Sequence, residues 1–213
     1  MLFAALSLTH SIAVIAPSLS LLQCVTQAAH ISREGAEGVS LMTWLISVFV
    51  AELWTGYGLV FHVSAELYSN TSYVAVACVV IVFAARHQGV LRRTTMIFIV
   101  ATALAVMISL VGTMHQWRWI LATLADVSAI VIYIPQMLLT LRSRDLQGVS
   151  LISWVLALMT SLAWGVFGLL IHQPAVALPS VVMFPSALVI LIQVSRHRLR
   201  ARGLDGSMAP LIE

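Results

Sequence analysis

One acidic side chain, Asp126, stands in the middle of a long apolar stretch, residues 119–141. Tyr133 follows seven residues later, two helical turns on and on the same helix face. If this stretch spans a membrane, the carboxylate costs about 2.5–3.5 kcal/mol there. Such a group indicates a proton site or a partner for a substrate amine. The alternative is a protonated or hydrogen-bonded structural carboxyl, and the sequence leaves both open.

Asn70, Trp54 and Trp164 are also placed where they could contact a solute. Asn70 is an amide within an apolar stretch, and its alternative role is a helix–helix hydrogen bond, worth only ~0.6 kcal/mol in membranes. Each tryptophan lies sixteen residues beyond a Gly-Val-Ser glycine, or ~24 Å of helix. At that depth a tryptophan either faces a cavity or belongs to the aromatic belt at the membrane surface.

The elements that must position these residues follow from composition. Hydrophobic residues make up 61% of the 213 residues and charged residues 9%, far from the soluble globular norm. Seven apolar stretches each have about the 20 residues that cross ~30 Å of hydrocarbon. They are roughly residues 6–29, 39–61, 67–85, 94–113, 119–141, 149–171 and 175–195. We therefore predict an all-α integral membrane protein with seven transmembrane helices.

The arginines predict the orientation. All eleven basic residues are arginine, and placing the N-terminus outside leaves only Arg118 on the outer face. The positive-inside rule therefore favours N-out/C-in. The net charge of +3 then reflects topology, which argues against nucleic-acid binding. The first helix lacks a preceding basic region, so we expect a retained span and not a cleaved signal.

The chain also contains an internal repeat. EGVSLMTW at 37–44 returns as QGVSLISW at 147–154, and the same offset of 110 residues aligns Trp54 with Trp164 and His62 with His172. We predict a 3+1+3 plan of two parallel repeats, in which an extra crossing restores the direction of the second repeat. The expected boundaries are 1–88 for the first three-helix repeat, 89–114 for the linker helix, 115–197 for the second repeat and 198–213 for a cytoplasmic tail.

The segment IPQMLLTLRSRDLQGVSLISW resembles a PQ-loop motif, with Pro135-Gln136 near one end of a helix and Gly-Val-Ser at the start of the next. The following SLAWGVFGLLIHQPAVALPS is similar to SWEET and SemiSWEET sugar transporters of the MtN3 branch. The resemblance covers essentially the whole chain. It implies a transporter whose two repeats enclose a central substrate site.

By this resemblance, the substrate-binding residues are Trp54 and Asn70 from the first repeat and Trp164 and Ser180 from the second. A tryptophan face stacks on the C–H face of a sugar, and an amide hydrogen-bonds to its hydroxyls. Ser180 stands where the family has asparagine, so we expect weaker hydrogen bonding on that side.

The resemblance also implies that Pro135 and Gln136 act in gating, because a proline removes a backbone hydrogen bond and kinks a helix. At the offset of 110 residues, Val25-Thr26 occupy the corresponding place, with Gln27 one step further on. We therefore expect the hinge in the second half only.

The first functional hypothesis is a SWEET-like facilitative carrier of a small sugar, multi-pass in the plasma membrane. One alternative is a proton-coupled PQ-loop carrier of amino acids or related metabolites that uses Asp126 and Tyr133. Another is a membrane receptor with the same fold that binds without transport. No enzyme motif, cofactor motif or metal-ligand spacing occurs in the sequence. The solute, the direction of flux and the oligomeric state stay open.

Overall fold

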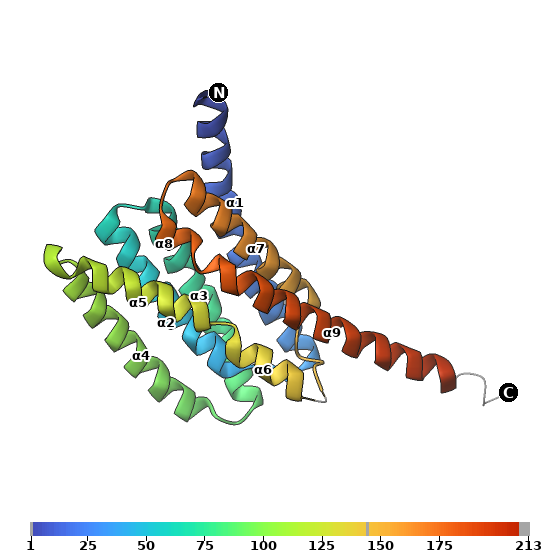
Figure 1. The fold of residues 1–213 in the computed structure, drawn as a ribbon. Helices are drawn as coiled ribbons and strands as arrows, with labels where there is room; N and C mark the ends of the chain where they lie inside the picture. Colours follow the sequence, from blue (N-terminus) through green and yellow to red (C-terminus); the bar gives the residue numbers. More distant parts are fainter. Residues whose placement is uncertain (1, 144, 209–213) are drawn as a thin grey trace.

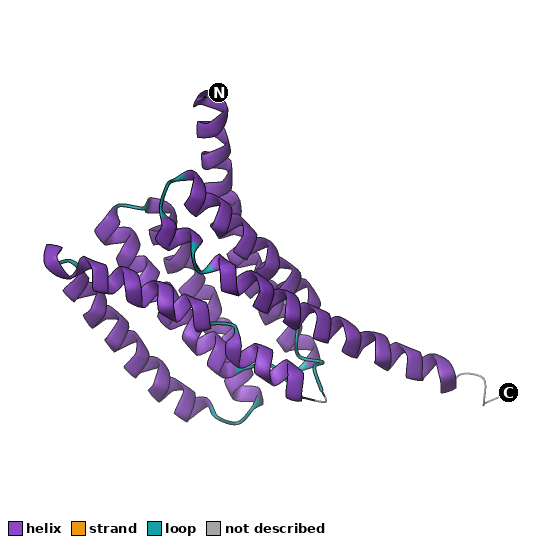
Figure 2. Ribbon diagram, in the orientation of Figure 1, coloured by secondary structure: helices purple, strands orange, loops and turns teal. Residues whose placement is uncertain are grey.

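The computed structural model describes residues 2–143 and 145–208; for 2–6 and 201–208 only the backbone is described. All regular structure in this part of the chain is helical (Figures 1 and 2). The helices are α1 (Leu2–Glu34), α2 (Leu41–Phe61), α3 (Ser64–His87), α4 (Leu91–Gly112), η1 (His115–Trp117), α5 (Arg118–Val131), α6 (Ile134–Arg142), α7 (Leu151–Leu170), α8 (Pro174–Ala177) and α9 (Ser180–Met208).

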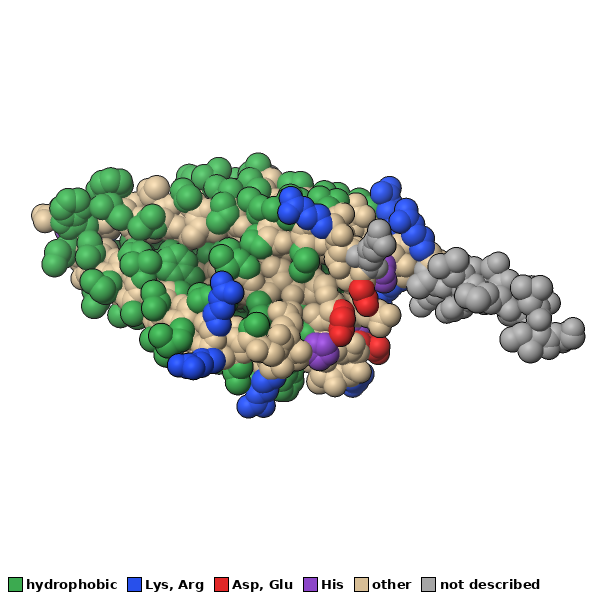
Figure 3. All heavy atoms as spheres, turned by 90° about the horizontal axis from the view of Figure 1, so that it is seen from below, with side chains coloured by type: hydrophobic (Ala, Val, Ile, Leu, Met, Phe, Trp, Pro, Cys, Tyr) green, Lys and Arg blue, Asp and Glu red, His purple; other side chains and the backbone are tan. Residues whose placement is uncertain are grey.

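The described residues contain seven segments long and apolar enough to cross a membrane, and they match the seven predicted stretches. The fifth combines η1, α5 and α6, and the seventh combines α8 with most of α9. Large apolar side chains such as Val100, Met107 and Leu110 are exposed on α4. Seen from below, charged side chains gather towards one end of the molecule and hydrophobic side chains cover much of the rest (Figure 3). The chain is a multi-pass integral membrane protein.

The repeated phrase forms the same helix start twice. The Ser40 hydroxyl caps α2 by accepting a hydrogen bond from Thr43 N at 3.2 Å. The Ser150 hydroxyl caps α7 by accepting from Ser153 N at 3.2 Å. A serine cap satisfies a backbone donor that would otherwise have no partner in the first turn. We call the end of the bundle that holds these two loops the GVS end.

The opposite ends of α2 and α7 also match. His62 and His172 both adopt left-handed backbone conformations, with φ of 59° and 53°. A Cβ on Gly58 would lie 2.6 Å from Leu67 N, and one on Gly168 would lie 2.5 Å from Ala177 N. Glycine is required at both positions because the chain folds back onto the helix within one turn. The two matched histidines therefore lie at nearly the same place in each repeat, His62 as the C-cap residue of α2 and His172 directly after the C-cap residue of α7.

The two repeats pack across each other. α1 lies beside α3 of its own repeat and against α7 of the other, while α2 packs against α3 and α5. α4 runs along the edge of the bundle and covers α2 (Figure 1). Glu52 points to this linker helix, where its Oε1 accepts from the Thr102 hydroxyl at 2.8 Å. Glu52 therefore faces away from the centre of the bundle and towards this helix.

Candidate functional site

Gln136, in α6, holds the loop of the other repeat at the GVS end. Its Nε2 donates to Gly38 O at 2.8 Å, and its Oε1 accepts from Ser40 N at 2.8 Å. The side chain is 2% exposed, so both backbone groups depend on it in place of water. This glutamine therefore ties α6 to the loop that starts α2.

Gln27, in α1, makes the same pair of bonds to the second loop. Its Nε2 donates to Gly148 O at 2.8 Å, and its Oε1 accepts from Ser150 N at 3.2 Å. Each repeat thus contributes one glutamine to the other repeat's loop. We call the two side chains, Gln27 and Gln136, the glutamine clasp.

The clasp corrects the alignment made from the sequence. Gln27 is the structural counterpart of Gln136. Thr26 therefore corresponds to Pro135, and the pair Val25-Thr26 does not correspond to Pro135-Gln136. The interval from Gln27 to Gly38 is 11 residues and that from Gln136 to Gly148 is 12. The second loop is one residue longer, and an offset of 110 is therefore wrong by one position in the first helix.

The fifth span is interrupted next to Pro135. α5 ends at Val131 and α6 begins at Ile134, with Pro135 in the first turn of α6. The equivalent part of α1 is one continuous helix through Thr26. The helix break thus exists in the second half only, as the sequence indicated. Its role as a gating hinge stays a prediction.

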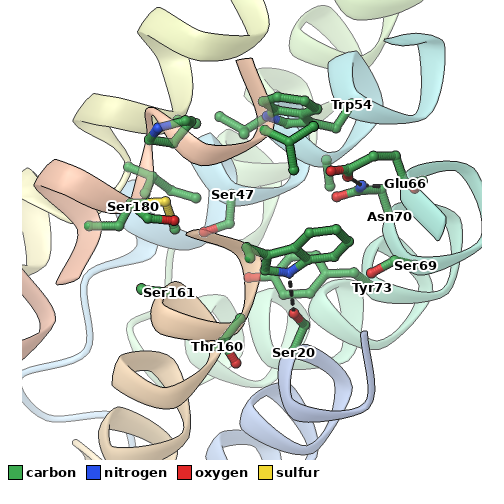
Figure 4. A pocket seen from close by; sticks show the side chains of 18 of the residues that line it. Ser20, Ser47, Trp54, Glu66, Ser69, Asn70, Tyr73, Thr160, Ser161 and Ser180 are labelled. Atoms are coloured by element: carbon green, nitrogen blue, oxygen red, sulfur yellow. Dashed lines mark hydrogen bonds between the residues drawn. The ribbon is translucent and has the colours of Figure 1, made fainter. Parts of the chain in front are cut away.

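A cavity of about 110 Å³, with room for several water molecules, lies between the two repeats (Figure 4). All four residues predicted to bind substrate line it: Trp54, Asn70, Trp164 and Ser180. Tyr133 lines it as well, from the break between α5 and α6. The close view places Asn70 and Ser180 on opposite sides of the space. Whether these residues bind a substrate stays a prediction.

The two tryptophans point into the bundle. Trp54 is 6% exposed, and its ring centroid lies 5.0 Å from that of Tyr57. Trp164 is half-buried, and its Nε1 donates to the Ser20 hydroxyl of α1 at 3.4 Å. Ser20 belongs to the first repeat and Trp164 to the second. Both rings are therefore held inside the bundle, at the cavity between the repeats.

The two walls of the cavity differ in chemistry. Positions related by 110 residues on α3 and on the α8–α9 segment both line it, but the first repeat supplies carboxyl, amide and phenol groups. The second repeat supplies apolar side chains and a short hydroxyl. Three of these pairs are Glu66 and Val176, Asn70 and Ser180, and Tyr73 and Met183; in a fourth, Ser69 corresponds to Pro179.

Glu66 is a site residue that the sequence interpretation missed. It is 4% exposed, and its Oε2 accepts from Asn70 Nδ2 at 2.8 Å (Figure 4). Asn70 Nδ2 also donates to Glu66 O at 2.8 Å, so the amide is held within α3 and makes no helix–helix bond there. The signal in the sequence was the spacing of four residues, which puts Glu66 on the face of Asn70.

Asp126 does not lie in the central cavity. It lines a neighbouring, mostly apolar groove between α5, α7, α8 and α9, which shares Ser161 and Ser180 with the cavity. Its Oδ1 is buried without a hydrogen-bond partner among the described residues. Tyr133 faces the cavity instead, so the structure does not bring the predicted pair into one site.

In the described part of the chain, no group of three histidine, cysteine, aspartate or glutamate side chains could hold a metal ion. Cys24 and Cys78 are both free thiols. What the arrangement offers is a set of aromatic faces, hydroxyls, two amides (Gln23 and Asn70) and one carboxyl around a cavity. Such groups bind a small polar solute without changing it covalently.

The sequence matches no protein-family model and no curated protein. Its structure is similar to that of a eukaryotic SWEET transporter, with a TM-score of 0.66 over 92% of this chain and 97% of the other. The two sequences are 11% identical across this match. The chain therefore has the SWEET-type seven-helix fold, which confirms the fold that the resemblance implied.

Proposed function

We propose that this protein is a facilitative transporter that carries a small solute, with a simple sugar as the first candidate, by alternating access between its two repeats. It acts without a cofactor and performs no chemical step, so it is not an enzyme. We place it in the plasma membrane with its N-terminus outside. Its GVS end then faces the cytoplasm.

The observation that carries this proposal is the cavity at the boundary between the repeats. Trp54 and Trp164 offer flat faces for a sugar ring, and Asn70 and Ser180 offer hydrogen-bonding groups from opposite walls (Figure 4). A site built from both repeats changes its access when one repeat moves against the other.

Bonds between the repeats exist at both ends of the cavity. The glutamine clasp joins them at the GVS end. At the opposite end, the Tyr57 hydroxyl donates to Gln173 Oε1 at 3.3 Å. Opening to the cytoplasm would separate the clasp, and opening to the outside would separate Tyr57 from Gln173. The break before Pro135 gives the second repeat a point at which α6 can move with the clasp.

Uptake of radiolabelled glucose and sucrose into proteoliposomes, with and without an inward proton gradient, tests the proposal. We expect uptake without a gradient and its loss in Trp164→Ala. Trp119→Ala, at an exposed tryptophan outside the cavity, is the matched control and should transport normally. If no solute enters under any condition, facilitated transport is refuted.

A second candidate function is proton-coupled transport of amino acids or related metabolites. The observation that favours it is Asp126, whose buried Oδ1 has no hydrogen-bond partner in the described part of the chain and lies in a groove that shares Ser161 and Ser180 with the cavity. Uptake of amino acids that depends on the gradient and is lost in Asp126→Asn would replace the first proposal. Binding without any flux would instead indicate a receptor.

A further inference from the structure

The central cavity contains one carboxyl group and no basic residue. Glu66 is the only aspartate, glutamate, histidine or arginine among the described residues that line it. Its carboxyl group accepts a hydrogen bond from the side-chain amide of Asn70, which carries no charge. A buried carboxylate is costly unless an opposite charge pairs with it, and nothing in the cavity wall supplies that charge. A solute with a positive charge would complete the pair.

The rest of the lining also suits a cation. Trp54, Trp164, Tyr73 and Tyr133 all contribute to the cavity. Aromatic faces, tryptophan best of all, attract a positive charge within about 6 Å of the ring centre. In the close view Glu66 lies between Trp54 and Tyr73 along the first repeat's wall (Figure 4). A carboxyl group beside aromatic rings therefore defines a place for a protonated amine.

The opposite wall limits what else the solute carries. Val176 and Met183 stand where the first repeat has Glu66 and Tyr73, so a second charge would find no partner there. The Ser180 hydroxyl lines the cavity on this wall. A hydroxyl group at this position can bond to a hydroxyl of the solute.

We propose that Glu66 recognises a protonated amino group of the transported solute, which makes the substrate a small hydroxylated amine of the amino-sugar class. This inference rests on the transport function proposed above and names the substrate of the same site. The ammonium binds at Glu66 and Asn70, the C–H face of the ring stacks on tryptophan, and a hydroxyl bonds to Ser180.

Glucosamine and glucose test the inference because they differ only at one position, where an ammonium replaces a hydroxyl. N-acetylglucosamine keeps the nitrogen but carries no charge. Uptake of each is measured into proteoliposomes of the full chain at about pH 7, where most of the amine is protonated and the carboxyl ionises more readily than at lower pH. We expect wild-type protein to take up glucosamine at least about tenfold faster than either neutral sugar.

Glu66→Gln removes the charge while keeping the shape and a hydrogen-bonding group. It should lower glucosamine uptake at least about tenfold and affect glucose uptake far less, so that the preference for glucosamine is lost. Glu52→Gln is the matched control, because Glu52 is an intramembrane carboxyl bonded to Thr102 outside the cavity. That variant should keep the preference for glucosamine.

Equal uptake of all three sugars, unaffected by Glu66→Gln, would refute amine recognition while leaving the transport function intact. If no sugar enters, the proposed transport function is refuted. Amine recognition is then tested separately, by ligand binding to the purified protein. Thermal stabilisation by glucosamine but not glucose, lost in Glu66→Gln, would support it; stabilisation by neither would overturn it. The thermal transition without ligand shows whether each variant is folded.

Discussion

The two repeats are alike at the GVS end and different around the cavity. At the GVS end, Gln27 and Gln136 make the same two bonds, and Ser40 and Ser150 make the same cap. Around the cavity, a carboxyl on one repeat faces a valine position on the other. The loop of each repeat has the same backbone N–H and C=O groups in need of hydrogen-bond partners, so the same side chain is required in both repeats. A wall that faces a solute has no such constraint, and the two walls are free to differ.

One difference between the repeats at the GVS end lies in the backbone, where α1 is continuous and α5–α6 is broken before Pro135. Thr26→Pro should therefore destabilise the protein by about 3 kcal/mol or more, because a proline inside a helix removes a hydrogen bond and clashes with the preceding turn. Unfolding in mixed detergent–SDS micelles measures this. Thr26→Ala is the control, since it removes only the side-chain bond to Gln23 O. A small effect of proline would mean that α1 can break as the fifth span does.

The matched glycines at the far ends of α2 and α7 should respond alike. Gly58→Ala and Gly168→Ala should each cost about 2–3 kcal/mol, because the added Cβ meets the backbone of the next segment at 2.6 and 2.5 Å. Gly165→Ala meets only the Ser180 side chain, at 3.1 Å, and should cost less than about 1 kcal/mol. The same unfolding measurement compares all three. Unequal losses at Gly58 and Gly168 would break the equivalence of the two turns.

The glutamine clasp should also be symmetric in energy. Gln27→Ala and Gln136→Ala each leave one buried backbone N–H and one buried or part-buried carbonyl without its partner, so each should lower the free energy of unfolding by about 2 kcal/mol. Gln147→Ala, at an exposed side chain of the same loop region, should change it by less than about 0.5 kcal/mol. A large loss for only one clasp glutamine would show that the two repeats are held unequally.

The smallest effect is expected for exchanging the polar groups of the cavity walls. Ser180→Asn gives the second repeat an amide, and we expect glucose to bind about threefold more tightly, as for one added hydrogen bond. Asn70→Ser should weaken glucose binding by about the same factor. Concentration dependence of uptake measures both. Unchanged affinity in both variants would remove these two positions from the proposed site.

The sequence predicted the fold from local and repeated features. Hydropathy identified the seven spans because membrane-crossing length depends on each segment by itself. The duplicated phrase paired Trp54 with Trp164, and the structure places both at the cavity. These predictions needed no knowledge of how one helix turns towards another.

Other features depended on packing between helices far apart in the chain. The one-residue difference between the loops became visible only when Gln27 and Gln136 were found on equivalent backbone groups. Asp126 was predicted as a site with Tyr133, but the break at Ile132–Tyr133 puts the two in different cavities. Helical spacing predicts a shared face only along an uninterrupted helix.

By itself, the sequence determined that this chain crosses the membrane seven times and repeats a three-helix unit. Only the tertiary structure decided which polar side chains share the central cavity, because the rotation of each helix is set by its neighbours. Glu66 is the example. In the sequence it is only an acidic residue near the start of a helix, whereas in the structure the packing of α2 and α3 turns it into the cavity beside Asn70.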